Sequence, residues 1–440
     1  TVVVKASRNP IDVSNTNNGV IFTAKELKAL PVGNDVASIV QLTPGVARGT
    51  NSVYGNAPSI GGSGQSENAF YVNGFPITNI LTQVGASELP FGAISNLQVL
   101  SGGYGSEFGR STGGVINITT KSGGNKVEFG GKVSIIPRSL KGTTENRYYP
   151  NTGANPITDG TLKYWNRDNG STSKVVGLYG SGPLIQNKLF AFVALEQTRT
   201  DGGAVAGARD DSDKVLPNGW RESRSKVDRM MAKLDYNLTD DHHFEYTKLY
   251  DRTTTDSQSY GFDYATLKRN NVPGGGSETT INCCGSSAAP GANVDIFKYT
   301  GYLTDNLTVT AMMGQSRTSH RRTPEGYNPL LAQTSSNAST QVPGLAYANP
   351  QTVTGSLVDP SSEDRQKAKR LDLEYKLGKH SLRGGIDRID VESKVGLSLA
   401  GGYRWSYLKA DDPNRAINGA FETPAQGGGY GAQGYYVSKD

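Results

Sequence analysis

The sequence predicts a mainly β fold that carries a small α+β domain at its N-terminus. The 440 residues include 55 Gly and 22 Tyr, a composition that favours short strands joined by tight turns. After residue 125, apolar and polar residues alternate with a period of two in successive segments, which is the pattern of β-strands. Before residue 125, helical stretches are mixed with short apolar strands and glycine turns. Two regions of different architecture are therefore expected.

The N-terminal region shows helix signals followed by strand signals. Thr23 can cap a helix that begins at Ala24, because its hydroxyl can accept a hydrogen bond from the first turn and Glu26 occupies the capping-box position. A second helix is expected over residues 35–42, ending before Pro44 and Gly45. Short strands are expected at 59–60, 68–73, 97–101 and 114–120.

Hairpins dominate the rest of the chain. The clearest surrounds Gly378 and Lys379, because residues alternate in polarity on both sides of this two-residue turn. Further hairpin turns are expected at 182–187, 239–241 and 305–306. In the hairpin around Gly378 and Lys379, we expect one set of alternating side chains to face lipid and the other set to face the lumen of a barrel. The lipid set is Leu371, Leu373, Tyr375 and Leu377, and the lumen set is Asp372, Glu374 and Lys376.

Long polar connections alternate with these short turns. They cover about residues 139–171, 200–222, 252–293, 318–366 and 392–430. Outer-membrane barrels have this asymmetry, with short periplasmic turns and long external loops. The lack of a run of 18 or more apolar residues excludes a spanning helix, whereas a barrel strand needs only about ten residues of alternating polarity. The predicted class is a membrane all-β barrel, with a soluble β-sandwich as the alternative.

Charge and reactive residues exclude several functions. The 45 basic and 40 acidic residues give a net charge of +5 without a long run of one sign, so nucleic acid is not an expected partner. Cys283 and Cys284 are adjacent, which leaves a vicinal disulfide or two free thiols open. His242 and His243 would point to opposite faces of a strand and cannot share a metal. We expect no catalytic residues, no metal and no cofactor.

Three segments, in order, resemble the plug of TonB-dependent outer-membrane receptors. Residues 30–46 resemble its helix and Pro-Gly-Val turn, and residues 69–77 its strand and turn, with Asn73 where Asp is usual. Residues 93–121 resemble its most specific signature, rich in glycine because the backbone turns tightly there. The motif residues so identified are Pro44, Gly45, Val46, Asn73, Gly74, Gly102, Gly103, Tyr104, Gly105, Glu107, Arg110, Gly113, Gly114 and Asn117.

The sequence departs from the family pattern at Gln98, Ser101 and Gly103, where Glu, Arg and Pro are usual. A charge lock between plug and barrel at those positions is therefore in doubt. Glu107 and Arg110 are candidates to replace it, and the alternative is that both are solvated surface charges. Residues 104–114 and the turn before Lys188 look most like the Oar-like branch of the family, although the small β-sandwich that often precedes the plug in that branch is absent from these 440 residues.

The first residues resemble a TonB box. Thr1 is followed by Val2, Val3 and Val4 and then by Lys5 and Ala6. An extended segment of this kind can add its backbone N–H and C=O groups to the sheet edge of a partner. The alternative is an ordinary first strand of the plug.

The resemblance implies a domain division and a set of partners. The TonB box would cover residues 1–8, the plug 9–125 and the N-terminal part of a barrel 126–440. Since family barrels have 22 strands and about ten are recognised here, the chain is expected to be incomplete.

The implied partners are the TonB C-terminal domain with its inner-membrane energising complex, outer-membrane lipid, and an imported ligand such as a peptide, glycan or chelate. The implied activity is TonB-dependent transport across a Gram-negative outer membrane; the alternative is a structural or adhesion barrel that retains a plug. Neither is an enzyme.

Overall fold

A computed structural model gives the fold of the chain. It describes residues 18–29, 35–49, 57–105, 107–209, 215–282, 291–328 and 361–399, with short pieces at 330–331, 333–334, 357–358, 402, 404–409 and 435–439. The expected TonB box at Thr1, Val2, Val3, Val4, Lys5 and Ala6 lies outside these residues, as do Leu30, Pro31, Cys283 and Cys284. No helix within the described ranges is long and apolar enough to cross a membrane.

The N-terminal domain is built on a five-stranded mixed sheet with the strand order β1-β6-β7-β4-β5. Only the β4–β7 pair is parallel. The sheet strands are β1 (Asn18–Thr23), β4 (Ala69–Val72), β5 (Phe75–Pro76), β6 (Ile94–Gly102) and β7 (Val115–Thr120). The other elements are α1 (Ala24–Ala29), α2 (Val36–Val40), the 3-10 helices η1 (Gln65–Glu67) and η2 (Phe91–Ala93), and the hairpin of β2 (Val46–Arg48) and β3 (Pro58–Ile60).

Both predicted helices are present, and the predicted Thr23 cap is confirmed. The Thr23 N–H donates to Glu26 Oε2 at 2.8 Å and the Glu26 N–H to Thr23 Oγ1 at 3.4 Å, so the capping box before α1 is complete. Asp35 caps α2 by accepting from the Ser38 N–H at 2.8 Å. The helix is shorter than expected, because the chain turns after Val40 toward Gly45, whose φ is 78°.

The rest of the chain forms a curved antiparallel sheet, here called the wall. Its order is β23-β22-β18-β17-β14-β13-β12-β11-β8, with β15, β16 and β19 beside β14. The strands are β8 (Glu128–Ile136), β11 (Gly170–Ile185), β12 (Leu189–Val205), β13 (Val215–Thr239), β14 (His242–Asp263), β15 (Lys268–Pro273), β16 (Glu278–Ile281), β17 (Asn293–Thr304), β18 (Leu307–Ser319), β19 (Arg321–Pro324), β22 (Glu363–Leu377) and β23 (His380–Lys394).

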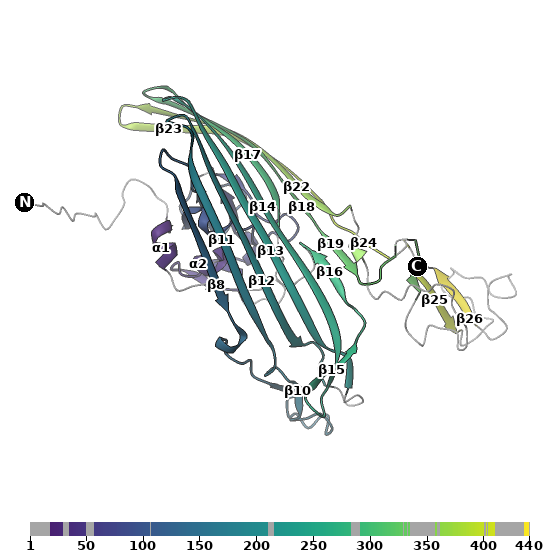
Figure 1. Ribbon diagram of the computed structural model, residues 1–440. Coiled ribbons are helices and arrows are strands. Elements are labelled where there is room, and N and C mark those ends of the chain that lie inside the picture. Colours follow the sequence, from purple (N-terminus) through teal and green to yellow (C-terminus); the bar gives the residue numbers. More distant parts are fainter. Residues whose placement is uncertain are drawn as a thin grey trace, which may run out of the picture.

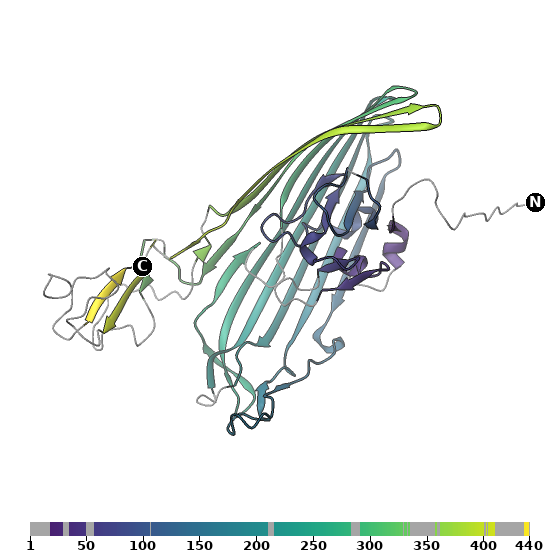
Figure 2. The same cartoon turned by 180° about the vertical axis from the view of Figure 1, so that it is seen from behind.

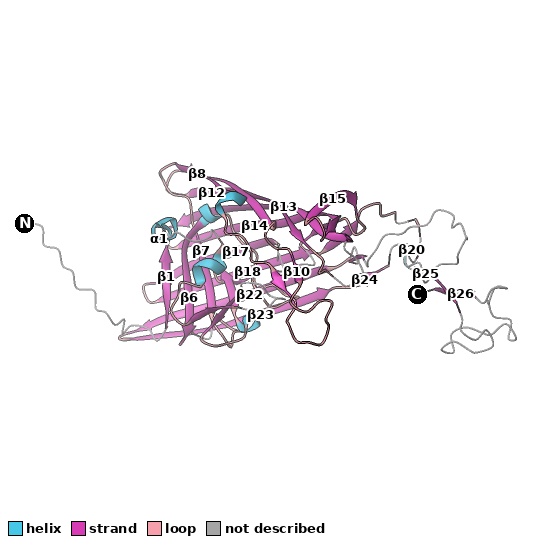
Figure 3. Cartoon of the chain, turned by 90° about the horizontal axis from the view of Figure 1, so that it is seen from below, coloured by secondary structure: helices cyan, strands magenta, loops and turns pink. Residues whose placement is uncertain are grey.

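The wall curves around the N-terminal domain, which lies against its concave face (Figures 1 and 2). Seen from below, β1, β6 and β7 lie between the β8 and β23 ends of the wall (Figure 3). Small elements lie outside this sheet. They are η3 (Arg138–Leu140), the pair β9 (Arg147–Tyr148) and β10 (Leu162–Tyr164), the pair β21 (Leu357–Val358) and β24 (Leu397–Ser398), and a sheet of β20 (Gln333–Thr334), β25 (Arg404–Lys409) and β26 (Tyr435–Lys439).

The wall strands are longer than the sequence predicted. Segments 200–222 and 252–293 were expected as loops, yet β12, β13 and β14 continue deep into them. The turn expected at 182–187 is also shorter, because β11 runs to Ile185. β13 has 25 residues. At about 3.3 Å per residue such a strand is roughly 80 Å long, far more than the ~30 Å hydrocarbon core of a bilayer. In a barrel of the predicted class, the outer part of β13 therefore extends beyond the bilayer.

The alternation of the wall strands is confirmed in β22. Leu371, Leu373, Tyr375 and Leu377 point outward and are between 41% and 54% exposed. On the other face, Asp372 pairs with Arg370 at 2.6 Å. Similar outward apolar side chains occur along the neighbouring strands, including Phe129, Val133, Leu178, Val193, Leu195, Leu234, Phe297, Met313, Leu382 and Ile386. This outward apolar band is the surface that a bilayer requires.

The inner face of the wall shares one apolar core with the N-terminal domain. Phe75 and Ile116 of the domain belong to the same buried cluster as Phe192 and Met231 of the wall. At Gly314 of β18 a Cβ atom would lie 2.6 Å from the Phe75 ring. Glycine is thus required there for the ring to reach the wall, and the two regions pack as one body.

Candidate functional site: the contact between domain and wall

The Asn73–Gly74 turn brings the N-terminal domain to the wall. Asn73 and Gly74 have positive φ values of 52° and 86°, which Asn and Gly tolerate best. Asn73 Oδ1 accepts from the Thr120 N–H at 3.0 Å, and its Nδ2 donates to Thr120 Oγ1 at 2.9 Å and to Thr247 Oγ1 of the wall at 3.5 Å. The amide side chain therefore supplies a donor that Asp would lack.

The glycine-rich motif residues are placed for close packing inside the domain. Tyr104 donates from its hydroxyl to the Gly113 carbonyl at 2.9 Å. A Cβ at Gly113 would lie 2.8 Å from Asn68 Oδ1, and one at Gly114 would lie 2.5 Å from the Ile60 side chain. The remaining positions are structural. Gly45, Gly103 and Gly74 have positive φ; Pro44 and Val46 flank Gly45; Gly102 ends β6; Gly105 accepts from the Phe108 N–H; and Asn117 lies in β7.

A charged cluster joins the domain to the wall, and no motif of the sequence pointed to it. Arg229 of β13 is ion-paired with Glu88 of the domain, with Glu196 of β12 at 3.0 Å and with Asp251 of β14 at 3.5 Å. The three wall residues form one cross-strand row. Their side chains are only 15%, 6% and 5% exposed. We call these four residues the Arg229 cluster.

The two wall carboxylates also hold the domain backbone. Asp251 Oδ2 accepts from the Glu88 N–H at 3.0 Å, and Glu196 Oε2 accepts from the Phe91 N–H at 3.1 Å. Hydrogen bonds to ionised groups are stronger than neutral ones. Segment 88–91 is thus fixed at both ends by side chains of the wall.

Three carboxylates share one guanidinium in the Arg229 cluster. Burial raises the pKa of Glu88 to about 7; the Arg229 charge opposes this rise, and the charges of Asp251, Asp35 and Glu196 add to it. About a quarter of the Glu88 side chain remains accessible, at 26%. Its charge state therefore changes near neutral pH.

A second contact involves Glu107, one of the two candidates to replace the charge lock that the sequence puts in doubt. Arg370 of β22 donates to the Glu107 carbonyl at 3.0 Å, and Arg383 of β23 pairs with its carboxylate at 3.2 Å. Arg110, the other candidate, has a left-handed φ of 61° and is exposed. No bond from Arg110 to the wall is present among the described residues. The structure brings one candidate to the wall and leaves the other at the surface.

A third contact lies where the N-terminal domain leads into the wall. Lys233 is 6% exposed; it donates to Ser122 Oγ at 2.8 Å and pairs with Glu245 at 2.8 Å and Asp235 at 3.2 Å. On another side of the domain, Gln366 Nε2 donates to the Pro76 carbonyl at 2.6 Å. Hydrogen bonds and ion pairs thus hold the domain to the wall on several sides. Each of them would have to break before the domain could separate from the wall.

An outward apolar band, an antiparallel wall and a small mixed domain on the concave face together define an outer-membrane β-barrel with a plug. The family model described as TonB-dependent Receptor Plug Domain matches residues 12–115. The chain thus carries the plug domain of TonB-dependent receptors, which are proteins of the Gram-negative outer membrane, and the N-terminal domain is hereafter called the plug.

Several known proteins resemble the chain, and two of them are described here. It is 29% identical to the TonB-dependent transporter Oar of Myxococcus xanthus over 268 residues, which covers 54% of this chain and 23% of that protein. The outer membrane transporter YddB from Escherichia coli has a similar fold, with a TM-score of 0.58 and 14% sequence identity, over 96% of this chain and 52% of that one. The chain therefore spans about half of that structure and less of the curated relative.

Proposed function

We propose that the protein transports a ligand across the outer membrane under the control of TonB, with the plug as its gate. The observation that carries this proposal is the position of the plug: it lies against the concave face of the wall, held by a shared apolar core and by breakable ion pairs such as Arg383–Glu107. A relative with 29% identity is named a TonB-dependent transporter, which supports it.

We further propose the division into a TonB box at 1–8, a plug at 9–125 and barrel strands at 126–440. In this scheme TonB pairs with Thr1 to Ala6 as an added strand, and the inner membrane provides the energy. The position of β1 supports the idea that TonB pulls on the plug through its N-terminal segment. β1 is an edge strand that pairs only with β6 among the described strands, and its residues are half-buried or exposed. Force on the N-terminus would reach this weakly held strand first.

The pairing is tested with two substitutions at one position. Val3→Pro removes a backbone N–H and disfavours the paired strand, whereas Val3→Thr keeps both the N–H and a β-branched side chain. We expect Val3→Pro to abolish binding of the purified receptor to the TonB C-terminal domain and Val3→Thr to retain it. Equal binding by both variants would contradict the proposed box.

Gating can be measured without knowing the ligand. In a Cys283→Ser/Cys284→Ser background, Val72→Cys places a thiol at a plug position that is 0% exposed. We expect a thiol reagent to label it in energised cells with TonB, and labelling to fall to the background level when Val3→Pro is added. Persistent labelling in that variant, or none in any energised cell, would favour a structural barrel with a retained plug.

A further inference from the structure

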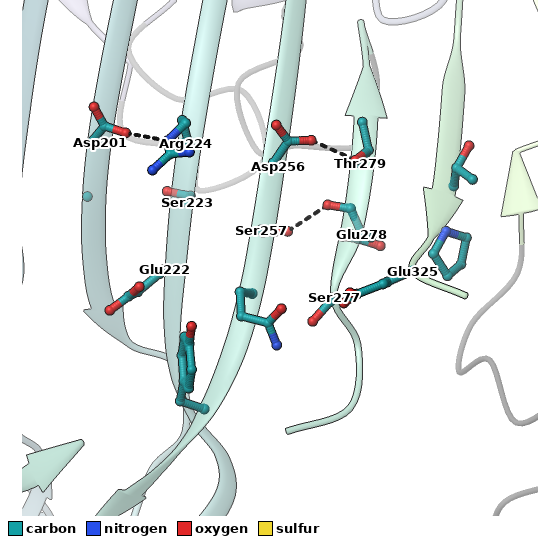
Figure 4. A pocket seen from close by; sticks show the side chains of 15 residues that line it. Asp201, Glu222, Ser223, Arg224, Asp256, Ser257, Ser277, Glu278, Thr279 and Glu325 are labelled. Atoms are coloured by element: carbon teal, nitrogen blue, oxygen red, sulfur yellow. Dashed lines mark hydrogen bonds and ion pairs between the residues drawn. The ribbon is translucent and has the colours of Figure 1, made fainter. Parts of the chain in front are cut away.

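A polar groove opens on the wall and is lined by wall residues. It encloses about 590 Å³, within the range of small-ligand sites. Figure 4 shows carboxylate and hydroxyl side chains from neighbouring strands converging on it. The residues used below are Asp201, Glu222, Arg224, Asp256, Gln258, Tyr260, Ser277, Glu278, Thr279 and Glu325.

Strand register places this groove on the outside of the wall. Glu196, Arg229 and Asp251 form the row that holds the plug. Five residues farther along the same strands, Asp201, Arg224 and Asp256 form another row without an intervening register shift. Since side chains alternate between faces, an odd displacement puts this second row on the opposite face. The groove therefore faces away from the lumen.

The groove also lies above the apolar band. Leu195, which is 50% exposed, is on the same face as Asp201 and six residues before it. That spacing is about 20 Å along the strand, toward the long-loop end of the wall. The groove is thus beyond the hydrocarbon, at the level of the headgroups and sugars of the outer leaflet.

The side chains in the groove are arranged for hydrogen bonding. Asp201 pairs with Arg224 at 2.9 Å, and Asp256 accepts from Thr279 Oγ1 at 2.6 Å, so both carboxylates are held in place (Figure 4). Ser277 is 9% exposed, yet its hydroxyl has no bonding partner in the described part of the chain. Fixed acceptors beside free donors suit a ligand with several hydroxyl groups.

The charge of the groove further restricts the kind of ligand that it can bind. Five acidic residues line the groove: Asp201, Glu222, Asp256, Glu278 and Glu325. Glu278 pairs with Arg221 and Arg322, Asp201 with Arg224 and Glu222 with Arg269. The Arg269 guanidinium lies 4.3 Å from the Tyr260 ring centroid and belongs to the same surface. The remaining negative charge disfavours phosphorylated or acidic ligands and is compatible with uncharged or amino sugars.

We propose that this outer groove binds a neutral saccharide, either the distal sugars of an outer-leaflet glycolipid or a free glycan of the same chemistry. The site is distinct from the transport path, because it lies on the other side of the wall from the plug. It would attach the receptor to the sugar layer of the cell surface. The proposal does not depend on TonB coupling or on the imported ligand.

The test uses the full-length receptor in nanodiscs and titrates it with neutral oligosaccharide released from the glycolipid of the same cells. We expect binding to weaken at least tenfold in Asp256→Ala and in Gln258→Ala. Asp390→Ala is the matched control: Asp390 is an outward carboxylate that is 58% exposed and pairs with Arg388, but it is on β23, away from the groove. It should bind within twofold of the unchanged protein, and heat-dependent gel migration should show all variants folded.

Two further arms identify the source of the sugar. Vesicles of the intact glycolipid should bind as tightly as the released fragment if the anchored form is the ligand, and more weakly if the ligand is a free glycan. The phosphorylated inner fragment should not bind. Lack of binding to any neutral fragment, or equal binding by Asp256→Ala and Asp390→Ala, overturns the proposal.

Discussion

Glu88 contributes a carboxyl group with a pKa of about 7 to the contact between plug and wall. That value is above the ordinary glutamate pKa of 4.5, so the folded, docked state holds the proton more tightly than the released state does. Its contribution to docking is fully present below about pH 4.5 and is lost as pH rises through about 7. We expect the protection factors of the amides in segment 88–91, which correct for the pH dependence of the intrinsic exchange rate, to be larger at pH 6 than at pH 8.

Glu88→Gln should flatten this pH dependence, because the amide stays neutral throughout. Glu67→Gln is the control, since Glu67 is also in the plug and its side chain accepts from the Gly64 N–H at 2.8 Å within that domain. It should leave the pH profile unchanged. An identical profile in Glu88→Gln would show that another group titrates.

Arg229 is the one cation of its cluster, with Glu88, Glu196 and Asp251 around it. Arg229→Ala leaves three carboxylates close together without a counter-charge. Removing one partner of a buried ion pair typically costs about 3–5 kcal/mol, so we expect the plug to unfold or leave at clearly lower urea concentration. Arg229→Lys should recover part of the stability lost in Arg229→Ala, because Lys keeps the positive charge but lacks the planar guanidinium that can bond several carboxylates at once. If Arg229→Ala has an unchanged urea midpoint, the Arg229 cluster does not stabilise the docked plug.

At the scale of elements, two motif glycines allow a matched comparison. A Cβ at Gly114 would lie 2.5 Å from the buried Ile60 side chain, whereas one at Gly102 would meet nothing within 4 Å. Gly114→Ala should destabilise the plug by about 1–3 kcal/mol through overpacking. Gly102→Ala should change it by less than about 0.5 kcal/mol. Urea unfolding of the plug in the full chain measures both, and equal effects would mean that Gly114 is not needed for packing.

The elements that the sequence predicted are those with local signals. The Thr23–Glu26 capping box and the Gly378–Lys379 turn involve neighbouring residues, and both appear as expected. β1 was missed, since its six residues pair with β6 and carry little pattern of their own. The outer parts of β13 and β14 were expected as loops because polar residues occupy both faces there, as they can outside the membrane.

The candidate site was predictable only in part, for a similar reason. Glu107 was noticed because it lies within a recognisable motif. Glu88, Glu196, Arg229 and Asp251 are far apart in the sequence, and their meeting depends on the register of three strands and on the seat of the plug. No spacing rule within one segment could have joined them.

At the scale of the whole molecule, the outward apolar band fixes how the wall sits in the bilayer. Leu373 is 45% exposed within this band, whereas Gln315 faces outward above it and bonds Asp295. Leu373→Arg should destabilise the folded wall by about 2–4 kcal/mol if it lies near mid-bilayer. Gln315→Arg should cost about 0–1 kcal/mol, since it lies near or above the interface. Unfolding in lipid vesicles measures the difference, and equal costs would place the band elsewhere.

The length of β13 and β14 has a further consequence for anything that approaches the plug from outside. With 25 and 22 residues these strands rise well above the bilayer. A solute that drifts in on the concave side is shielded from the open medium on that flank. The solute collides repeatedly with the concave face of these strands before it diffuses away. Even weak, short-lived contacts there therefore increase its residence time. The length of these strands, rather than a single tight binding site, then raises the chance that a rare molecule reaches the plug.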